Sequence, residues 1–351
     1  MAIDTQPGII ENRLDENGSR RLVAELREYL LSPVEPNLRL NPNWLAHRLN
    51  VSENELLSAL AFAIRDGLVE LHWETFCPKC GGFSTHFDTL SKAHSKVECP
   101  TCESDFEVQL DRDVHVTFSA SLRSERLRDG ESFAVPPEEK QFPLTNGLDL
   151  LLIPSFHKLF SGEAPPENES LRIGRITILF TDLRGSTAMY AERGDPSAYR
   201  MVRVHFDILN QLVERNHGVV VKTIGDSVMA SFSSAADAVR CGLELQVELE
   251  SNLETIGGRL WLKVGIHTGT CLAVNLNERL DFFGGAVNTA ARLLGLSHGG
   301  DVVISDEVMA EITAANLRFN LLESLESQLR GLPDPLCVHR IDPSLALPHQ
   351  Q

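Results

Sequence analysis

The stretch that most constrains the fold of this chain is residues 219–232, VVVKTIGDSVMASF. Two apolar, β-branched runs flank Gly225-Asp226, a dipeptide typical of a tight hairpin turn whose backbone takes positive φ angles. The sequence therefore predicts a strand, a turn and a second strand. The Asp226 carboxylate is expected at the exposed tip and Lys222 on the first strand. A hairpin needs neither charge, so both are candidates for a functional role.

A second carboxylate, Asp182, ends another apolar run at residues 176–181, ITILFT. Carboxylates at strand ends, each followed by small polar residues, can hold a hard cation that in turn binds a phosphate-bearing substrate. Asp182 and Asp226 are therefore the candidate ligands of such a cation.

Length and charge limit the classes of protein to consider. A chain of 351 residues is expected to hold two or three domains, and its 42% hydrophobic residues suffice for packed cores. The net charge of −17 weighs against nucleic acid or an anionic membrane as a partner, because both require clustered Lys and Arg. No signal-peptide pattern begins the chain, and the longest apolar stretches, such as residues 148–154, are too short to span a bilayer. We therefore expect a cytoplasmic protein that binds neither nucleic acid nor an anionic membrane.

The first part of the chain carries helix signals. Apolar residues recur at helical spacing in residues 21–31, and residues 41–71 predict two helices followed by a strand. Ser52 opens a capping box for the second helix, which Gly67 can end. The order is winged-helix-like, and such units often bind DNA. Residues 1–130 hold only 14 Lys and Arg against 21 Asp and Glu, so we favour a packing or protein-interaction module.

Two CxxC pairs follow, separated by 18 residues: Cys77 and Cys80, then Cys99 and Cys102. This spacing predicts a zinc site in which four thiolates fill every coordination position, so we expect a structural ion. A redox pair is the alternative, but it would need a thioredoxin-like βαβ setting that the neighbouring sequence lacks. His86 and His94 lie between the pairs and are expected to stay outside the site. The odd total of seven cysteines fits a reducing compartment.

The C-terminal part alternates strands and helices in the order β-α-β-β-α-β. This order predicts an α+β fold with a ferredoxin-like sheet, to which further C-terminal strands are added. We expect separate strands at residues 261–267 and 271–275, and a helix at residues 286–296. Segments rich in Pro, Glu and Ser precede this region and mark a connector at residues 123–170.

Four motifs of this region resemble those of the class III nucleotidyl cyclase (adenylate/guanylate cyclase) catalytic domain. They are LFTDLRGST around Asp182, VKTIGDSVMASF around Asp226, LKVGIHTG at residues 262–269 and DFFGGAVNTAARL at residues 281–293. The upstream cysteine-containing region also resembles an uncharacterised domain found before bacterial cyclases of this type. The expected domains are a small winged-helix-like and zinc-ribbon domain at residues 1–122, the connector at 123–170, the ferredoxin-like catalytic domain at 171–342 and a tail at 343–351.

The resemblance implies that Asp182, Asp226 and the carbonyl of Leu183 hold two Mg²⁺ or Mn²⁺ ions per active site. These ions would activate the ribose 3′ hydroxyl of ATP and neutralise charge on its triphosphate. Asn288 would orient the ribose, and Arg292, one helical turn later, would stabilise charge on the α-phosphate. The alternative for Asn288 and Arg292 is an ordinary exposed helix face.

The resemblance also assigns Lys222 and Asp281 to base recognition. In the family this pair reads adenine, since the ammonium donates to ring N1 and the carboxylate accepts from the 6-amino group. ATP is therefore the expected substrate, although guanylate cyclase activity is the nearest rival. The structural alternative for the pair is a cross-strand salt bridge.

Two positions depart from the family pattern. Thr270 stands where many members carry an Arg that holds the terminal phosphates, while Arg330 occupies the place of a phosphate-binding Lys. Arg330 is a candidate phosphate ligand, or a solvated Arg before a turn.

Because the family divides each site between two subunits, a homodimer with two equivalent sites is implied. Its N-terminal domain would regulate the enzyme through an unknown ligand or protein. A non-catalytic nucleotide sensor and a zinc-dependent transcription regulator are the alternatives of other classes.

Overall fold

The computed structural model of the chain describes residues 22, 24–26, 39–121, 141–332 and 334–343. Residue packing divides the chain into two compact units: Met1–Leu71 with Thr117–Leu144, and His72–Val116 with Thr145–Gln351. The boundaries predicted at residues 122, 170 and 342 stay predictions. Of the helix expected at residues 21–31, Leu22 and residues 24–26 are helical and the rest lies outside the described residues.

The first unit contains the two predicted helices, α2 (Pro42–Leu49) and α3 (Glu53–Arg65). The capping box of α3 is confirmed, because the Ser52 amide donates to Glu55 Oε2 at 2.9 Å and the Glu55 amide donates to Ser52 Oγ. Gly67 follows the helix end with a φ of 71°. The winged-helix-like character of this unit stays a prediction.

The second unit begins with the four-cysteine segment, which we define as residues 72–116. Its strand β2 (Phe83–Phe87) pairs with β1 (Val69–Phe76), and β3 (Lys96–Glu98) pairs with β4 (Asp105–Glu107). β1 lies between β2 and β5 (Val114–Ala120) in a three-stranded sheet. Short helices α5 (Gly147–Leu151) and α6 (Pro154–Leu159) form where the sequence predicted an apolar part of the connector.

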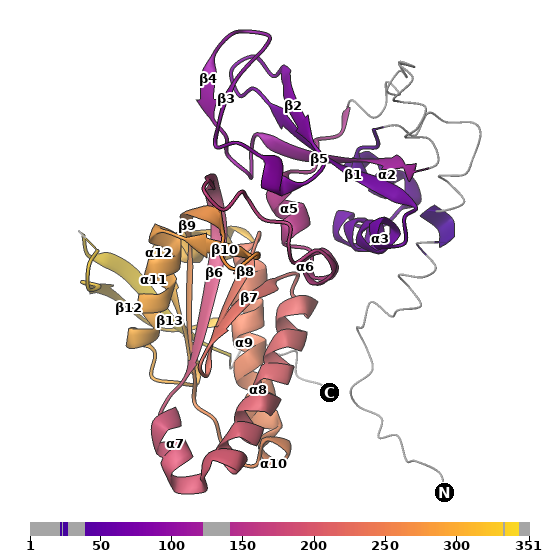
Figure 1. The fold of residues 1–351 in the computed structure, drawn as a ribbon. Helices are drawn as coiled ribbons and strands as arrows, with labels where there is room; N and C mark the ends of the chain where they lie inside the picture. The colour runs from indigo at the N-terminus through magenta and orange to yellow at the C-terminus, as the bar shows by residue number, and fades with distance from the viewer. Residues whose placement is uncertain (1–21, 23, 27–38, 122–140, 333, 344–351) are drawn as a thin grey trace, which may run out of the picture. The chain divides into compact units, whose positions relative to one another are not determined.

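A mixed eight-stranded sheet forms the core of the second unit (Figure 1), with the order β12-β13-β11-β9-β6-β8-β7 and β10 paired to β9. Its strands are β6 (Ser170–Leu183), β7 (Val219–Ile224), β8 (Ser227–Phe232), β9 (Leu262–Asn275), β10 (Leu280–Phe283), β11 (Asp301–Ser305), β12 (Asn320–Ser327) and β13 (Leu336–Asp342). The helices are α7 (Ser186–Arg193), α8 (Asp195–Arg215), α9 (Ala235–Ser251), α10 (Leu253–Ile256), α11 (Gly285–Leu293) and α12 (Asp306–Ala314).

This sheet confirms the predicted α+β cyclase-type fold, because β9-β6-β8-β7 is the antiparallel ferredoxin-like core and β11 to β13 extend it. The two strands expected at residues 261–267 and 271–275 are instead one continuous strand, β9. It stays continuous because β6 pairs with it on both sides of Gly269-Thr270. The helix expected at residues 286–296 ends at Leu293 and continues as one 3₁₀ turn.

The two faces of this sheet differ in what covers them. Leu179, Val228 and Val264 belong to the core that the sheet forms with α8 and α9. Side chains alternate along a strand, so Asp182 and Met229 point to the opposite face, as does Lys222, which pairs with Met229. Helix α11 packs on that second face, where a Cβ on Gly265 would lie 2.7 Å from the Ala290 carbonyl oxygen. The predicted functional residues of the strands and of α11 therefore share one side of the sheet.

The four-cysteine segment attaches to β6 through hydrogen bonds to the main chain of that strand. The register of β6 against β9 shifts between Ile173 and Ile176, and the amides of Gly174 and Arg175 both donate to the Asp111 carboxylate at 2.9 Å. The Leu110 amide donates to the Arg172 carbonyl at 2.8 Å. The segment is thus joined to the strand that ends near Asp182.

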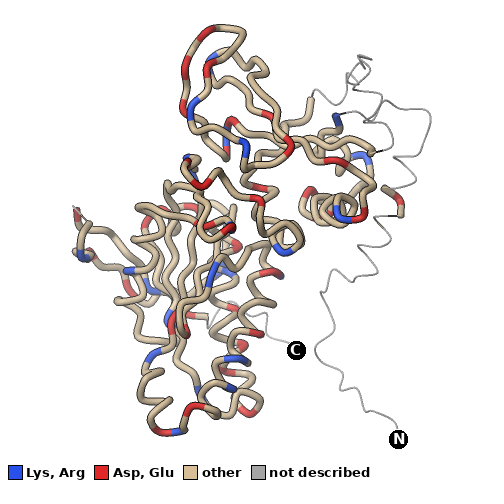
Figure 2. Tube along the Cα trace, in the orientation of Figure 1, with Lys and Arg blue, Asp and Glu red and all other residues tan. Residues whose placement is uncertain are grey.

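Lys and Arg are interspersed with Asp and Glu along the described chain (Figure 2). Among the described helices, none combines the length and the apolar character needed to cross a bilayer.

Candidate active site

The β7–β8 hairpin places the two predicted metal-binding carboxylates next to each other. Gly225 takes a φ of 64°, which allows the tight turn. Thr181 pairs with Val228 across β6 and β8, so Asp182 lies opposite Ser227, the residue that follows Asp226. Ser227 Oγ donates to Asp182 Oδ1 at 2.6 Å, whereas Asp226 Oδ2 is buried without a hydrogen-bond partner. The hairpin thus brings together one hydrogen-bonded and one unpartnered carboxylate.

A histidine on α8 sharpens the case for a cation at this point. His205 is 0% exposed, and burial lowers its pKa to about 4 although the Asp226 carboxylate acts in the opposite direction. The imidazole is therefore neutral at neutral pH and cannot balance the charge of Asp226. Buried charges in proteins are normally paired or bind a metal, and carboxylate oxygens are the ligands that Mg²⁺ and Mn²⁺ prefer. The residues present fit a hard divalent cation. Leu183 ends β6 directly after Asp182, and the role of its carbonyl stays a prediction.

Lys222 and Asp281 are joined in the structure although 58 residues separate them in the chain. Lys222 Nζ donates to Asp281 Oδ1 at 2.8 Å and to Oδ2 at 2.6 Å, and the Phe282 amide also donates to Oδ1. Their side chains are 29% and 6% exposed, so this is a half-buried ion pair. The Lys222 ammonium also lies 5.1 Å from the ring centroid of Phe283. The salt-bridge alternative is thus observed, and it leaves the third ammonium N–H and one face of the carboxylate for a ligand.

Helix α11 presents the two remaining predicted catalytic residues on one side. Its buried side chains are Ala286, Thr289, Ala290 and Leu293, so it packs through the side that excludes Asn288 and Arg292. Asn288 is exposed and Arg292 is half-buried. A Cβ on Gly331 would lie 3.1 Å from Arg292 Nη2, so the guanidinium contacts the loop between β12 and β13. This loop also carries Arg330, whose side chain is exposed.

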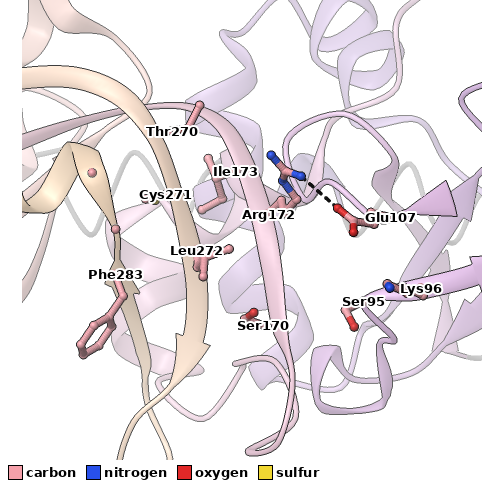
Figure 3. Close-up of a pocket in the computed structure, with 12 residues that line it drawn as sticks. Ser95, Lys96, Glu107, Ser170, Arg172, Ile173, Thr270, Cys271, Leu272 and Phe283 are labelled. Atoms are coloured by element: carbon pink, nitrogen blue, oxygen red, sulfur yellow. Dashed lines mark hydrogen bonds and ion pairs between the residues drawn. The ribbon is translucent and has the colours of Figure 1, made fainter. Parts of the chain in front are cut away.

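Thr270, the position that departs from the family pattern, lines a pocket of about 460 Å³ between the four-cysteine segment and the sheet. Ser95, Lys96 and Glu107 line it from the segment (Figure 3). Arg172 lines it from β6 and pairs with Glu107 at 2.9 Å. Thr270 therefore supplies a hydroxyl where the resemblance places a guanidinium.

The four cysteines form one cluster, with every pair of sulfurs within 4.8 Å. Cys77 Sγ lies 3.8 Å from Cys102 Sγ, and Cys80 Sγ lies 3.7 Å from Cys99 Sγ. A tetrahedral ion with Zn–S bonds of about 2.3 Å requires sulfur separations of about 3.8 Å. The spacing therefore fits a zinc ion. His86 contacts His72, and His94 contacts Glu169.

The acidities of these thiols differ because the four sulfurs are crowded together. Burial opposes ionisation of Cys99, but the amides of Cys102 and Thr101 outweigh it and lower its pKa to about 6. Cys80 receives a hydrogen bond from the Gly82 amide, which favours its thiolate. Even so, desolvation and the neighbouring sulfurs raise its pKa to about 12. Four crowded thiolates repel one another, and a divalent ion would relieve that repulsion.

Sequence reasoning missed three residues that shape this site: His205 beside Asp226, Ser227 on Asp182, and Phe283 beside Lys222. Ser227 follows Asp226 directly, so the hairpin register could have identified it. Phe283 depends on β10, a four-residue strand that was not predicted. His205 was hidden because its electrostatic interaction with Asp226 joins two separate elements, α8 and the hairpin.

Comparison with known families places this site in a class. Residues 169–341 match the model described as the adenylate and guanylate cyclase catalytic domain, and residues 12–160 match a family of unknown function, DUF5939. Residues 169–341, just under half of the chain, thus form a domain that matches the adenylate and guanylate cyclase catalytic family.

Individual relatives are similar over part of their length. An adenylate cyclase of Mycosarcoma maydis is 30% identical over 171 residues, which are 42% of this chain and 6% of that protein. An uncharacterised protein of Mycobacterium tuberculosis is 30% identical over 212 residues, covering 59% of this chain and 64% of the relative. The chain thus spans less than two thirds of either relative.

Two solved structures are also similar. The adenylyl cyclase CyaB from P. aeruginosa is 22% identical with a TM-score of 0.45, covering 49% of this chain and 95% of that one. The guanylyl cyclase Cya2 is 24% identical with a TM-score of 0.45, and the match covers 49% of this chain and 93% of that one.

Proposed function

We propose that the protein is an adenylate cyclase that converts ATP into 3′,5′-cyclic AMP and pyrophosphate. The observation that carries the proposal is the buried oxygen of Asp226 that has no hydrogen-bond partner. Asp226 lies on the hairpin that also holds Lys222, and this hairpin brings it next to Asp182 on β6. A chain that buries an unpaired carboxylate incurs a stability cost, which a catalytic cation would offset. The proposed reaction joins the ribose 3′ oxygen to the α-phosphorus and releases pyrophosphate.

Each predicted residue has a role in that reaction. Asp182, Asp226 and the Leu183 carbonyl would hold Mg²⁺ or Mn²⁺, which when bound lowers the pKa of the 3′ hydroxyl and neutralises phosphate charge. Asn288 would hold the ribose and Arg292 would stabilise the charge that develops on the α-phosphate. Arg330 would bind a terminal phosphate from the loop that touches Arg292.

Adenine is the proposed base because of the hydrogen-bonding groups at Lys222 and Asp281. The free ammonium N–H can donate to adenine N1, and the carboxylate can accept from the 6-amino group. Guanine offers a donor at N1 and an acceptor at O6, so both contacts would be mismatched. Guanylate cyclase activity is the second candidate, since the family model that matches residues 169–341 describes adenylate and guanylate cyclases alike.

A homodimer is proposed because apolar side chains are exposed around the base-reading pair. Ile224 at the end of β7 is 56% exposed, Leu272 on β9 is 37% exposed and Phe283 on β10 is 48% exposed. Exposed apolar residues that cluster around polar ones are typical of an interface. In a symmetric dimer, Asp226 of one chain would act with Lys222 of the other, which gives two equivalent sites.

Regulation by the N-terminal part is proposed through the junction at β6. The four-cysteine segment, with its proposed structural zinc, binds the Gly174 and Arg175 amides through Asp111, and the same strand ends at Leu183. The pocket lined by Lys96 and Thr270 offers space for a regulatory ligand at this junction. The cytoplasmic location expected from the sequence stays a prediction.

The alternatives of other classes have less support. A non-catalytic nucleotide sensor would be favoured by loss of a metal-binding Asp, Asn288 or Arg292, and all are present. A DNA-binding regulator would need a basic surface, which the acidic balance of residues 1–130 disfavours.

The direct test is an assay of the purified full chain with ATP or GTP and Mn²⁺. We expect cyclic AMP as the main product and, with Asp182→Asn, almost none. A dimer that makes no cyclic nucleotide would overturn the proposal. Preferential production of cyclic GMP would support the second candidate instead.

Base choice has its own variant. Lys222→Glu alone would set a second carboxylate against Asp281, which is 6% exposed, so it should be combined with Asp281→Ser. Glu at 222 can accept from guanine N1, and Ser at 281 can donate to O6. The double variant should shift the ratio of GTP to ATP turnover upward. An unchanged ratio in a folded variant would show that this pair does not read the base.

A further inference from the structure

We propose that Asp306, Cys337 and His339 form a second transition-metal site, selective for Zn²⁺, on the C-terminal strands. One oxygen, one sulfur and one ring nitrogen from these residues lie within 4.8 Å of one another. None of them belongs to the four-cysteine cluster or to the hairpin carboxylates. The site is independent of the cyclase activity proposed above.

The fold brings the three ligands together from two elements. Cys337 and His339 lie two residues apart on β13, so their side chains leave the same side of the strand. Asp306 is the first residue of α12, whose N-cap Ser305 pairs with Val338, the residue between them. The arrangement therefore depends on regular strand pairing.

The separations match the edges of a tetrahedral zinc site. His339 Nε2 lies 3.1 Å from Asp306 Oδ1 and 3.9 Å from Cys337 Sγ. Zn–N and Zn–O bonds of about 2.0 Å and a Zn–S bond of about 2.3 Å require edges of about 3.3 Å and 3.6 Å. Shifts of a few tenths of an ångström would bring both edges at His339 to these values, and the remaining edge, from Asp306 to Cys337, is within 4.8 Å.

A fourth residue orients the imidazole. Ser324 Oγ on β12 lies 2.8 Å from His339 Nδ1. When Nδ1–H donates to this hydroxyl, the Nε2 lone pair faces Asp306 and Cys337, which is the usual support of a metal-binding histidine. In the metal-free alternative, Nε2–H donates to Asp306 and Cys337 has no role.

The ligand types select the ion. A thiolate and an imidazole favour Zn²⁺ over Mg²⁺ or Ca²⁺, which prefer oxygen ligands. Three protein ligands leave a fourth position for water. The His339 side chain is 10% exposed and that of Asp306 is 67% exposed, so an ion can enter from solvent on the Asp306 side.

Cobalt titration of the full chain tests the site. The four-cysteine cluster is first loaded with zinc, which is spectroscopically silent, and excess Mg²⁺ occupies the hairpin carboxylates. Added Co²⁺ should bind in one equivalent per chain, with a thiolate-to-cobalt charge-transfer band and the visible bands of four-coordinate cobalt. Absence of the charge-transfer band would overturn the proposal.

Single variants identify the ligands. Cys337→Ser should abolish the charge-transfer band, and Asp306→Asn, a change at an exposed side chain, should weaken cobalt binding by at least tenfold. Ser324→Ala should weaken binding by about 10- to 100-fold while keeping the band, since it acts through His339. Glu307→Gln on the same helix is the matched control and should bind normally. A band that persists in Cys337→Ser would place the cobalt elsewhere and refute the site.

Discussion

The unpartnered oxygen of Asp226 predicts that one substitution should stabilise the metal-free protein while abolishing its activity. Asp226→Asn keeps the shape of the side chain and removes its charge. A buried charged oxygen that lacks a hydrogen bond costs about 1–3 kcal/mol, and the neutral His205 beside it offers no compensation. Asn keeps an unpartnered polar atom at this place and removes only the charge, so we expect Asp226→Asn to gain about 1 kcal/mol in free energy of unfolding in chelator, the lower end of that range.

When the metal is bound, Asp226→Asn should instead be less stable than the wild-type protein. A ligand at 100 times its dissociation constant stabilises the folded state by about 2.7 kcal/mol, and the variant should lose most of this gain. Thermal unfolding measured in chelator and in saturating Mn²⁺ detects both effects. Each kcal/mol should shift the midpoint of unfolding by roughly 2–4 °C in a domain of this size. Cyclic AMP production by Asp226→Asn should be almost absent under either condition.

Asp182→Asn is the matched control for this prediction. Its Oδ1 already accepts a hydrogen bond from Ser227 at 2.6 Å, so neutralising it should bring no comparable gain in chelator. If Asp226→Asn is less stable than the wild-type protein in chelator, or if Mn²⁺ leaves the order unchanged, Asp226 is not an unpaired metal ligand.

Three further predictions concern the dimer, pH and zinc. Inactive Asp226→Asn and Arg292→Ala chains, mixed so that they exchange subunits, should recover about a quarter of wild-type activity, because half the dimers then hold one intact site; no recovery would place each site within one chain. In metal-free buffer, the free energy of unfolding should fall by roughly 3 kcal/mol from pH 6.5 to about 4, because the unfolded chain binds the His205 proton first. His205→Gln should flatten that dependence, and an equally steep curve would contradict the assignment. Cys99→Ser should lower the zinc content measured by mass spectrometry, whereas Cys271→Ala should not; equal losses would speak against the four-cysteine site.

The parts of the structure that the sequence predicted are those with local causes. The hairpin follows from Gly225-Asp226 between β-branched runs, and the start of α3 follows from Ser52 and Glu55 three residues apart. The four cysteines were recognisable because each CxxC pair is itself a local turn. In each case a few neighbouring residues determine the geometry.

The parts that escaped prediction depend on distant contacts. β9 continues through Gly269-Thr270 only because β6 pairs with it there. The ion pair between Lys222 and Asp281 requires β10 to approach β7, and no local pattern indicates that approach. The carboxylates were identified from their positions at strand ends, but the missing partner of Asp226 became evident only from the packing around α8.

The contact between Asp111 and β6 limits how this protein could have exchanged parts during evolution. β6 pairs with β8 over residues 177–181, and the four-cysteine segment takes up the strand where that pairing stops. A Cβ at Gly174 would meet the side-chain amide of Gln109, which would have to move aside. A catalytic domain that received this segment by recombination would need the same register shift, because it presents the Gly174 and Arg175 amides to Asp111. The two parts are therefore expected to be inherited together, and a chain cut at residue 170 would lose the hydrogen bonds that Leu110 and Asp111 make to the backbone of β6.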